Sequence, residues 1–517
     1  MLSKKWFATS VFIILLLYSS LPVSNAFEGQ ETTIPFDLNQ DQQDDYTLSI
    51  KGWAAEVEPE VQKVSYPYAT YTHYIYKQAQ DYFRLTVVDM KNGDIFYTAR
   101  NYPSVEENEI RLSVVAHESS PTARVFSPAQ KGFWDPVSQT QLPDIPAGWR
   151  TLENLPFVTT TSLYLDSEQL HYRIGHVDVF KPLGYSVFQE LVTQEPETEI
   201  IQNEDKNVTY TLSLKAGDSF FSDTWGILST KPLVSWDNPT AANEALQVEI
   251  DKKFSLDGAF YQTPSNYRPY EKNSYYLNPA NVIGLRFLHR IDAENSNGTL
   301  FEDMATHLAY MSVQRQNPEG FWPTMPRSLW LSGDYNIEFD YMDNRRNADN
   351  VTFLMRYAYQ KPDFAIQSAL KNWDQYLQAY IKKHAVPVPE GGVLVPDYVG
   401  DENAKTSHIS LNHHLSNLNY LLESYMIDKD PSKLELAEQL LKGVENTAFL
   451  WVMPNHNLYY ALTPELKLYK PNEYPDYATL TRDDLEETQR LLTKMGKVRN
   501  PKLQFLIDQK NIWLNNR

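Results

Sequence analysis

The C-terminal half of the chain repeats itself about every 70 residues. Similar helix-forming stretches, spaced 69, 67 and 70 residues apart, begin at residues 281, 350, 417 and 487. Each has the 3.6-residue apolar period of an amphipathic helix, passes through a short turn and enters a second helix rich in Leu, Ala and aromatic residues. Regular spacing of helix pairs is typical of helical repeat architectures. Residues 240–517 are therefore expected to form about four helical hairpins that close into an α/α toroid.

The preceding part of the chain has a period of two. Apolar and polar residues alternate in several short segments, among them 84–87, 95–99, 110–114 and 209–214. Asn92-Gly93 separates two such segments and predicts a β-hairpin with a type I′ turn. We expect residues 46–233 to form an antiparallel β-sandwich or barrel, preceded by a polar linker at 27–45. The predicted fold class is α+β multidomain, with the β domain ahead of the toroid.

The first 26 residues have the pattern of an export signal. Lys4 and Lys5 precede an apolar run at residues 11–17, and small residues lead to Ala26. Cleavage after Ala26 is expected, with an uncleaved N-terminal anchor as the alternative. Either outcome predicts a bacterial protein that is secreted or held in the cell envelope. No later stretch is apolar enough to span a membrane, so no membrane association is expected after cleavage.

Charge and cysteine content exclude several functions. The chain has 46 Lys and Arg against 66 Asp and Glu, a net charge of −20 that becomes −22 once the two lysines of the signal are removed. Nucleic-acid binding requires a basic surface, so a nucleic-acid partner is not expected. The absence of cysteine excludes thiol nucleophiles, disulfides and cysteine-ligated zinc.

The repeat also predicts where a site lies. Short turns within the hairpins lie on one rim of a toroid, and long connections between hairpins lie on the other. The three long connections, residues 317–344, 385–408 and 449–480, exceed the usual length of structureless loops, which favours a functional role. They lie where the inner helices begin, so that helix N-termini present partial positive charge to the same cavity.

These three loops combine aromatic rings, carboxylates and cations, as a sugar site requires, because rings stack on sugars and charged groups bind hydroxyls or uronates. The expected substrate-binding residues are Trp322, Arg327, Trp330, Tyr335, Glu338, Arg345, Lys405, His408 and Lys467. Adjacent His413 and His414 cannot share one helix face, so one of them is expected to face the cavity. The spacing typical of histidine metal ligands is absent, and neither a metal nor another cofactor is expected.

Residues of about 280–517 resemble the D-glucuronyl C5-epimerases, whose β-domains precede a toroid of about four helical hairpins. The similarity rests on tyrosine-bearing loops that open into Leu-rich inner helices, and on three local matches: Pro396-Asp-Tyr398, Leu458-Tyr459-Tyr460 and Asp476-Tyr477. This resemblance implies that Tyr398, Tyr460 (or Tyr459) and Tyr477 are acid/base residues of a uronate epimerase.

Such an epimerase removes the C5 proton of a uronate and returns one to the other face, which requires two acid/base groups beside the ring and a cation for the carboxylate. A glycoside hydrolase with Glu338 and Asp397 as its carboxylate pair is one alternative, and a polysaccharide lyase on the same scaffold is another. A non-catalytic glycan-binding or cell-envelope protein is the third. Each predicts a polysaccharide or oligosaccharide as the partner; association into a homodimer is left open.

Overall fold

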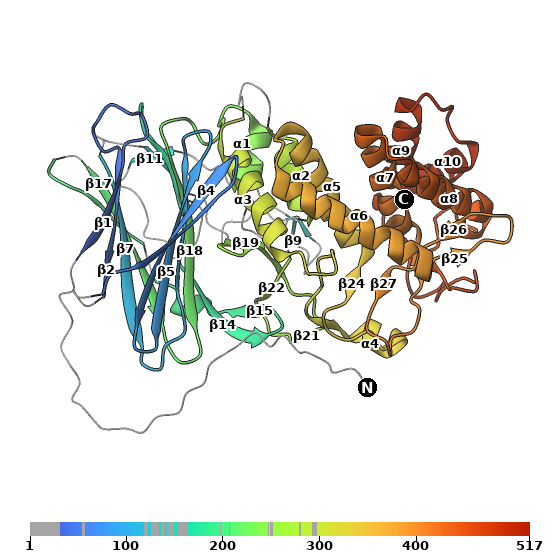
Figure 1. The fold of residues 1–517 in the computed structure, drawn as a ribbon, viewed down its shortest axis with the longest axis horizontal. Helices are drawn as coiled ribbons and strands as arrows, with labels where there is room; N and C mark the ends of the chain where they lie inside the picture. Colours follow the sequence, from blue (N-terminus) through green and yellow to red (C-terminus); the bar gives the residue numbers. More distant parts are fainter. Residues whose placement is uncertain are drawn as a thin grey trace.

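The computed structural model describes residues 31–516 with gaps. The gaps are residues 54–56, 197, 206, 247, 249–251, 279–280 and 292–296, and most of 118–162, where only β8, β9, β10 and β11 are described. The predicted export signal lies outside the described residues. Most strands occupy one side of the molecule, and the helices occupy the other together with several short strands (Figure 1). The expectation of a multi-sheet β region ahead of a helical region is confirmed.

Two antiparallel sheets form most of the β region. The five-stranded sheet has the order β1 (Thr32–Phe36), β2 (Tyr46–Lys51), β7 (Asn108–Ala116), β17 (Val208–Ala216), β16 (Glu199–Gln202). The 14-stranded sheet contains β3 (Glu60–Ser65), β4 (Ala69–Gln78), β5 (Asp81–Met90), β6 (Ile95–Asn101), β8 (Thr122–Val125), β11 (Trp149–Thr151), β12 (Leu163–Asp166), β13 (His171–Ile174), β14 (Asp178–Gly184), β15 (Val187–Glu190), β18 (Phe221–Ser229), β19 (Lys252–Ser255), β20 (Gly258–Gln262) and β22 (Ser274–Leu277). Two further strands, β9 (Trp134–Asp135) and β10 (Thr140–Gln141), pair with each other.

The period of two produces the core between these sheets. Leu48 and Leu112 of the small sheet and Leu85 of the large one are fully buried in one cluster. Alternate residues of a strand face the same side, so each strand contributes one apolar row to the interior. Burying such rows, at about 25 cal/mol per Å² of apolar surface, holds the two sheets together.

Three local features differ from the sequence expectations. Residues 32–36, inside the expected linker, form β1, because Thr33, Pro35 and their neighbours alternate in exposure along β2. At Asn92-Gly93 only Gly93 has a positive φ (101°), so the hairpin does not contain a type I′ turn, which needs positive φ at both residues. Strands β19, β20 and β22 follow α1 (Pro239–Leu246) and extend the large sheet beyond the expected domain boundary.

The C-terminal helices follow the repeat. They are α2 (Asn281–Leu288), α3 (Leu300–Arg315), α5 (Asn344–Gln360), α6 (Phe364–His384), α7 (Leu411–Asp428), α8 (Pro431–Thr447), α9 (Leu480–Lys494) and α10 (Pro501–Asn515). Helix α2 packs on α5, α5 on α7 and α7 on α9; we call these four the inner helices. Each also packs on the helix that follows it: α3, α6, α8 or α10. Asp363 caps α6 and Pro431 opens α8, as expected for short turns.

Helix α3 joins the two regions. Its His307 is buried, stacks on Phe96 of β6 with ring centroids 4.5 Å apart, and lies 2.9 Å from the Ser255 carbonyl oxygen of β19. The helical region is therefore packed against the large sheet (Figure 1). Within the described residues, no helix has the length and apolar character needed to cross a membrane.

Candidate functional site

The three long loops are joined to one another just before the inner helices begin. Strand β24 (Met342–Asp343) pairs with β27 (Tyr398–Val399), which ties the first loop to the second. Strand β28 (Ile409–Ser410) pairs with β29 (Ala461–Leu462), which ties the second to the third. Two more short pairs flank them, β21 (Tyr267–Arg268) with β23 (Arg327–Ser328) and β25 (Val386–Pro387) with β26 (Val393–Leu394). Strand β24 runs directly into α5, and β28 runs directly into α7. The first two strand pairs therefore hold their side chains at the N-termini of these helices.

Aromatic side chains from all three loops meet at this point. This aromatic cluster consists of Trp330, Tyr335, Tyr341, Tyr398, His408, Tyr460, Tyr469 and Tyr474. Trp330, on the short helix α4 (Leu329–Tyr335), stacks on His408 with centroids 5.0 Å apart, and His408 stacks on Tyr469 at 4.7 Å. The indole N–H of Trp330 donates to Tyr469 Oη at 2.8 Å. Sugar binding uses flat ring faces, and Trp330 and Tyr474 are the rings of this cluster that are partly exposed.

Asp397 fixes the geometry beneath the rings. It is fully buried and accepts hydrogen bonds from the Ser410 backbone N–H (2.7 Å) and hydroxyl (2.6 Å) at the start of α7. Its Oδ2 lies 3.2 Å from His408 Nε2. Burial opposes ionisation of Asp397, but His413, His408 and Ser410 outweigh it and lower its pKa. Asp397 is therefore an ionised residue that positions its neighbours.

His413 is the titratable group best placed for proton transfer. Its Nδ1 lies 2.8 Å from Asn344 Oδ1, and 3.8 Å from a carboxylate oxygen of both Asp343 and Asp397. Its ring is in edge contact with Tyr398, with centroids 5.3 Å apart. Nε2 forms no hydrogen bond with any residue in the described part of the chain. His414, by contrast, points toward α8 and Leu440, so one histidine of the pair faces the site, as expected.

The three tyrosines implied by the resemblance lie together. The ring centroids of Tyr460 and Tyr477 are 6.2 Å apart. The ring centroid of Trp330 lies 6.3 Å from that of Tyr398 and from that of Tyr460. Tyr398 and Tyr460 are each 9% exposed, whereas Tyr477 is 50% exposed. No described residue forms a hydrogen bond with the hydroxyl of Tyr398 or Tyr460. Both hydroxyls are therefore available to a bound molecule.

The electrostatics of these phenols favour the protonated form. Burial raises the pKa of Tyr398 well above its ordinary value, and the Tyr460 and Asp343 side chains raise it further. Burial, Asp397 and Tyr477 do the same for Tyr460. A phenol of raised pKa keeps its proton at neutral pH, so these tyrosines suit proton donation better than proton removal.

The nearby cations are already paired with carboxylates. Arg345 binds Asp349 (3.1 Å) and Asp484 (2.5 Å), and Arg327 binds Glu338 at 3.0 Å. A lysine that the sequence analysis did not select, Lys470, lies 2.7 Å from Asp334 Oδ2. That carboxylate oxygen also accepts from the Trp330 indole, so the pair belongs to the aromatic cluster.

The remaining residues predicted from the sequence differ in whether they belong to the aromatic cluster. Tyr335 and His408 belong to it, joined by a 2.9 Å contact between Tyr335 Oη and His408 Nδ1. Trp322 does not: it is 4% exposed in the helical core, and its indole N–H donates to the Ser312 carbonyl at 2.7 Å. Lys405 and Lys467 are exposed, and neither forms an ion pair with a described residue. Asn344, Asp343 and Lys470 are the site residues that sequence reasoning missed, whereas His413 was predicted only as one member of the His413/His414 pair.

A cavity of about 1040 Å³ lies on the opposite rim, where the inner helices end. Its lining includes Arg356 and Glu423, which form an ion pair at 2.7 Å, together with Tyr359 and Lys494. None of the residues selected from the long loops lines it.

The chain matches no protein-family model and no curated protein. Among solved structures, a family 76 glycoside hydrolase from a bovine Bacteroides thetaiotaomicron strain is similar over 80% of this chain and 77% of its own, with 12% identity and a TM-score of 0.37. A cellobiose 2-epimerase from Spirochaeta thermophila is similar over 50% of this chain and 66% of its own, with 13% identity and a TM-score of 0.36. A D-mannose isomerase is similar over 44% of this chain and 54% of its own, with 15% identity and a TM-score of 0.32.

Proposed function

We propose that this protein is a carbohydrate-active enzyme. Its four inner helices, together with the helix that follows each of them, form an α/α toroid. Its site lies where the three long loops meet the N-termini of α5 and α7. The observation that carries the proposal is His413, whose Nδ1 is held by Asn344 Oδ1 at 2.8 Å below a cluster of aromatic rings. A positioned histidine beside ring faces is what proton transfer on a bound sugar requires.

The reaction that suits these groups is proton abstraction from a sugar carbon next to a carbonyl group. His413 Nε2 takes the proton, and the electron pair left on carbon moves onto the carbonyl oxygen. Tyr398 or Tyr460, kept protonated by burial and by nearby carboxylates, returns a proton to carbon. Return to the opposite face inverts the carbon, so the proposed class is a saccharide epimerase.

The finer proposal is epimerisation at C5 of a polysaccharide uronate. It requires a cation that neutralises charge moving onto the carboxylate. Lys470 is paired with Asp334 at 2.7 Å, so the lysine without an ion pair to a described residue is exposed Lys405, whose backbone N–H donates to the Tyr335 carbonyl at 2.8 Å. Because Arg327 and Arg345 are paired with carboxylates, an uncharged oligosaccharide with a reducing end is the second candidate substrate.

Hydrolysis by Glu338 and Asp397 is not favoured by the geometry. Asp397 has no exposed surface and is hydrogen-bonded to Ser410, while Glu338 is paired with Arg327. A glycosidase needs both carboxyl groups beside the scissile bond. We also propose export of the protein, on the strength of the N-terminal signal pattern.

Incubation with substrates in deuterated water tests the proposal. A uronate polysaccharide and a neutral reducing oligosaccharide are each incubated with enzyme and followed by NMR. Deuterium at C5 of the uronate, or at the carbon next to the reducing carbonyl, without chain cleavage is the expected result. Unsaturated ends would instead identify a lyase, and new reducing ends alone a hydrolase. Binding without any reaction would identify a glycan-binding protein.

A further inference from the structure

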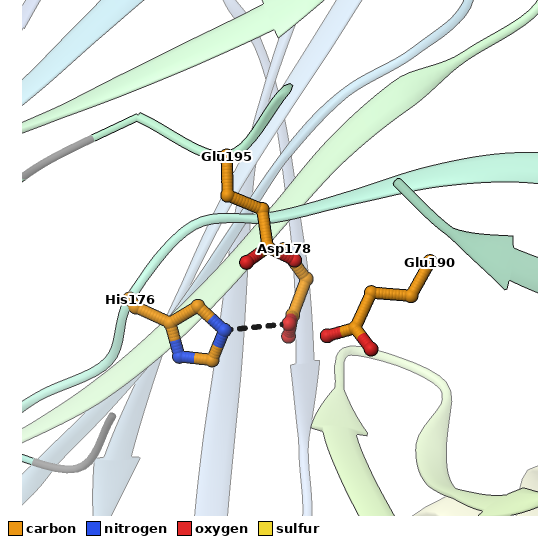
Figure 2. A group of neighbouring side chains, drawn as sticks. All are labelled: His176, Asp178, Glu190 and Glu195. Carbon is orange, nitrogen blue, oxygen red and sulfur yellow. Dashed lines mark ion pairs between the residues drawn. The ribbon is translucent and has the colours of Figure 1, made fainter. Parts of the chain in front are cut away.

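Far from the candidate site in the sequence, four potential metal ligands converge on one side of the large sheet (Figure 2). They are His176, Asp178, Glu190 and Glu195. Asp178 begins β14 and His176 precedes that strand by two residues. Glu190 ends β15, and Glu195 follows the short 3₁₀ helix η3 (Val192–Gln194). One ligand atom from each residue lies within 4.8 Å of all the others, and all four are buried.

Glu195 is the member of this group that points to a ligand. It is 6% exposed, yet neither of its carboxylate oxygens has a hydrogen-bond partner among the described residues. Burying a carboxylate without donors costs several kcal/mol, and a nearby cation removes most of that cost. The side chain is directed at the other three ligands (Figure 2).

Among the described residues, the basic side chains that contact the group are Lys253 and His176. Lys253 of β19 lies 2.8 Å from Asp178 and 2.6 Å from Glu190, and His176 Nε2 lies 2.7 Å from Asp178. Lys253 and His176 are therefore both engaged with Asp178, and the Glu195 carboxylate has no hydrogen-bond partner among the described residues. With His176 neutral, the Lys253 ammonium and one divalent cation together balance the three carboxylates.

We propose that His176, Asp178, Glu190 and Glu195 bind a divalent first-row transition-metal ion of the Zn²⁺ or Mn²⁺ type. An imidazole nitrogen with carboxylate oxygens and no sulfur is a donor set for these ions. Their bonds to nitrogen and oxygen are about 2.0–2.2 Å long, so ligands on one ion lie about 3–4 Å apart. Small side-chain rotations close the observed group to that size. Ca²⁺ prefers six to eight oxygen ligands and fits this donor set less well.

The ion would stabilise a hairpin that contacts the first long loop. Asp178 and Glu190 lie on the two strands β14 and β15, and the turn between these strands carries Tyr185. Tyr185 stacks on Phe339 of the first loop with centroids 3.7 Å apart. The proposed metal therefore has a structural role, independent of the proposed reaction.

The test uses the full-length protein after treatment with EDTA and dialysis. Calorimetric titration with ZnCl₂, MnCl₂ and CaCl₂ is expected to show one equivalent of Zn²⁺ or Mn²⁺ bound and weaker Ca²⁺ binding. The melting temperature is expected to rise with metal concentration, because an ion that binds only the folded state stabilises it. Glu195→Gln is expected to weaken binding at least tenfold.

Glu199→Gln is the matched control, because Glu199 is an exposed acid on β16, and it is expected to bind metal like the wild type. Metal-free Glu195→Gln is expected to melt no lower than metal-free wild type, because the wild-type carboxyl group has no hydrogen-bond partner to lose, and to melt below it once metal is added. Wild-type protein that binds neither Zn²⁺ nor Mn²⁺ at about 1 mM overturns the proposal. A Glu195→Gln variant that binds metal as tightly as the wild type also overturns the proposal.

Discussion

His413 Nδ1 and Asn344 Oδ1 are 2.8 Å apart, and this contact fixes the tautomer of the histidine. Asn344 Nδ2 donates to the Pro396 carbonyl at 2.6 Å, so Oδ1 is the acceptor and His413 Nδ1 must carry the proton. The lone pair of neutral His413 is therefore on Nε2. Asn344 begins α5, and Pro396 lies two residues before β27, so backbone elements of the fold hold the proposed base in this tautomer.

Replacing His413 is expected to remove activity without loss of folding. In His413→Asn the side-chain amide can still donate to Asn344 Oδ1, but no base remains at the Nε2 position. Loss of one general base lowers kcat by about 10²–10⁴-fold. The control is His456→Asn, because His456 is exposed on the third loop and bonds to Gln509. Equal kcat values for the two variants would contradict the role of His413.

Removing the hydroxyl of Tyr398 or Tyr460 is expected to lower activity while leaving the free energy of unfolding almost unchanged. Neither hydroxyl bonds to a described residue, so Tyr398→Phe and Tyr460→Phe are expected to change the free energy of unfolding by less than about 0.5 kcal/mol. At least one of them is expected to lower kcat by about 100-fold, because the proton donor is lost. Steady-state kinetics and urea unfolding measure the two effects. Tyr359→Phe, on the exposed far rim, is the control.

Trp330→Ala is expected to weaken substrate binding and to destabilise the loops. The substitution removes the ring that stacks on His408 and the N–H that donates to Tyr469. We expect KM to rise about tenfold and the free energy of unfolding to fall by about 2 kcal/mol, less than for a fully buried Trp. Trp330→Phe restores a ring and should recover most of the binding. A KM unchanged in Trp330→Ala would place the substrate elsewhere.

His414 makes the protein less stable in acid. It accepts from the Val395 backbone N–H at Nδ1 and donates to the Leu440 carbonyl at Nε2, so the neutral ring is fully bonded. Burial lowers the pKa of His414 from 6.5 to about 4, although the Leu440 carbonyl opposes this. Below pH 6.5 the unfolded chain binds the proton first, so stability is lost as the pH falls from 6.5 to 4, by about 3 kcal/mol for this residue.

Denaturant unfolding of the wild type and His414→Gln between pH 4 and 8 measures this effect. The variant is expected to be less stable at pH 7, because it loses a bond, and the difference should shrink toward pH 4. Parallel stability curves for the two proteins would rule out His414 as the source.

The sequence predicted the positions of the long loops better than the contacts of individual side chains within them. Repeat spacing sufficed to place the long loops at the start of the inner helices, because helix periodicity is a local property. The proximity of Tyr398 and Tyr460 followed from the resemblance. The tautomer of His413 could not be predicted, since it depends on a contact between Asn344 and Pro396, 52 residues apart.

Composition alone could not separate core from site. Trp322 looks like a sugar-stacking residue in the sequence, but its neighbours bury it and Ser312 accepts its indole N–H. Lys467 and Lys470 are three residues apart, yet only Lys470 reaches Asp334. His176 and Asp178 are close in the sequence, but Glu190 and Glu195 join them only in the folded chain.

The most direct test compares deuterium uptake by saccharide substrates with wild-type protein and with His413→Asn. Wild-type protein is expected to introduce solvent deuterium at a carbon next to a carbonyl group, without cleaving the chain, and His413→Asn to introduce at least 100-fold less. Equal deuterium uptake with both proteins, or new reducing ends without uptake, would contradict the assignment of this site to epimerisation.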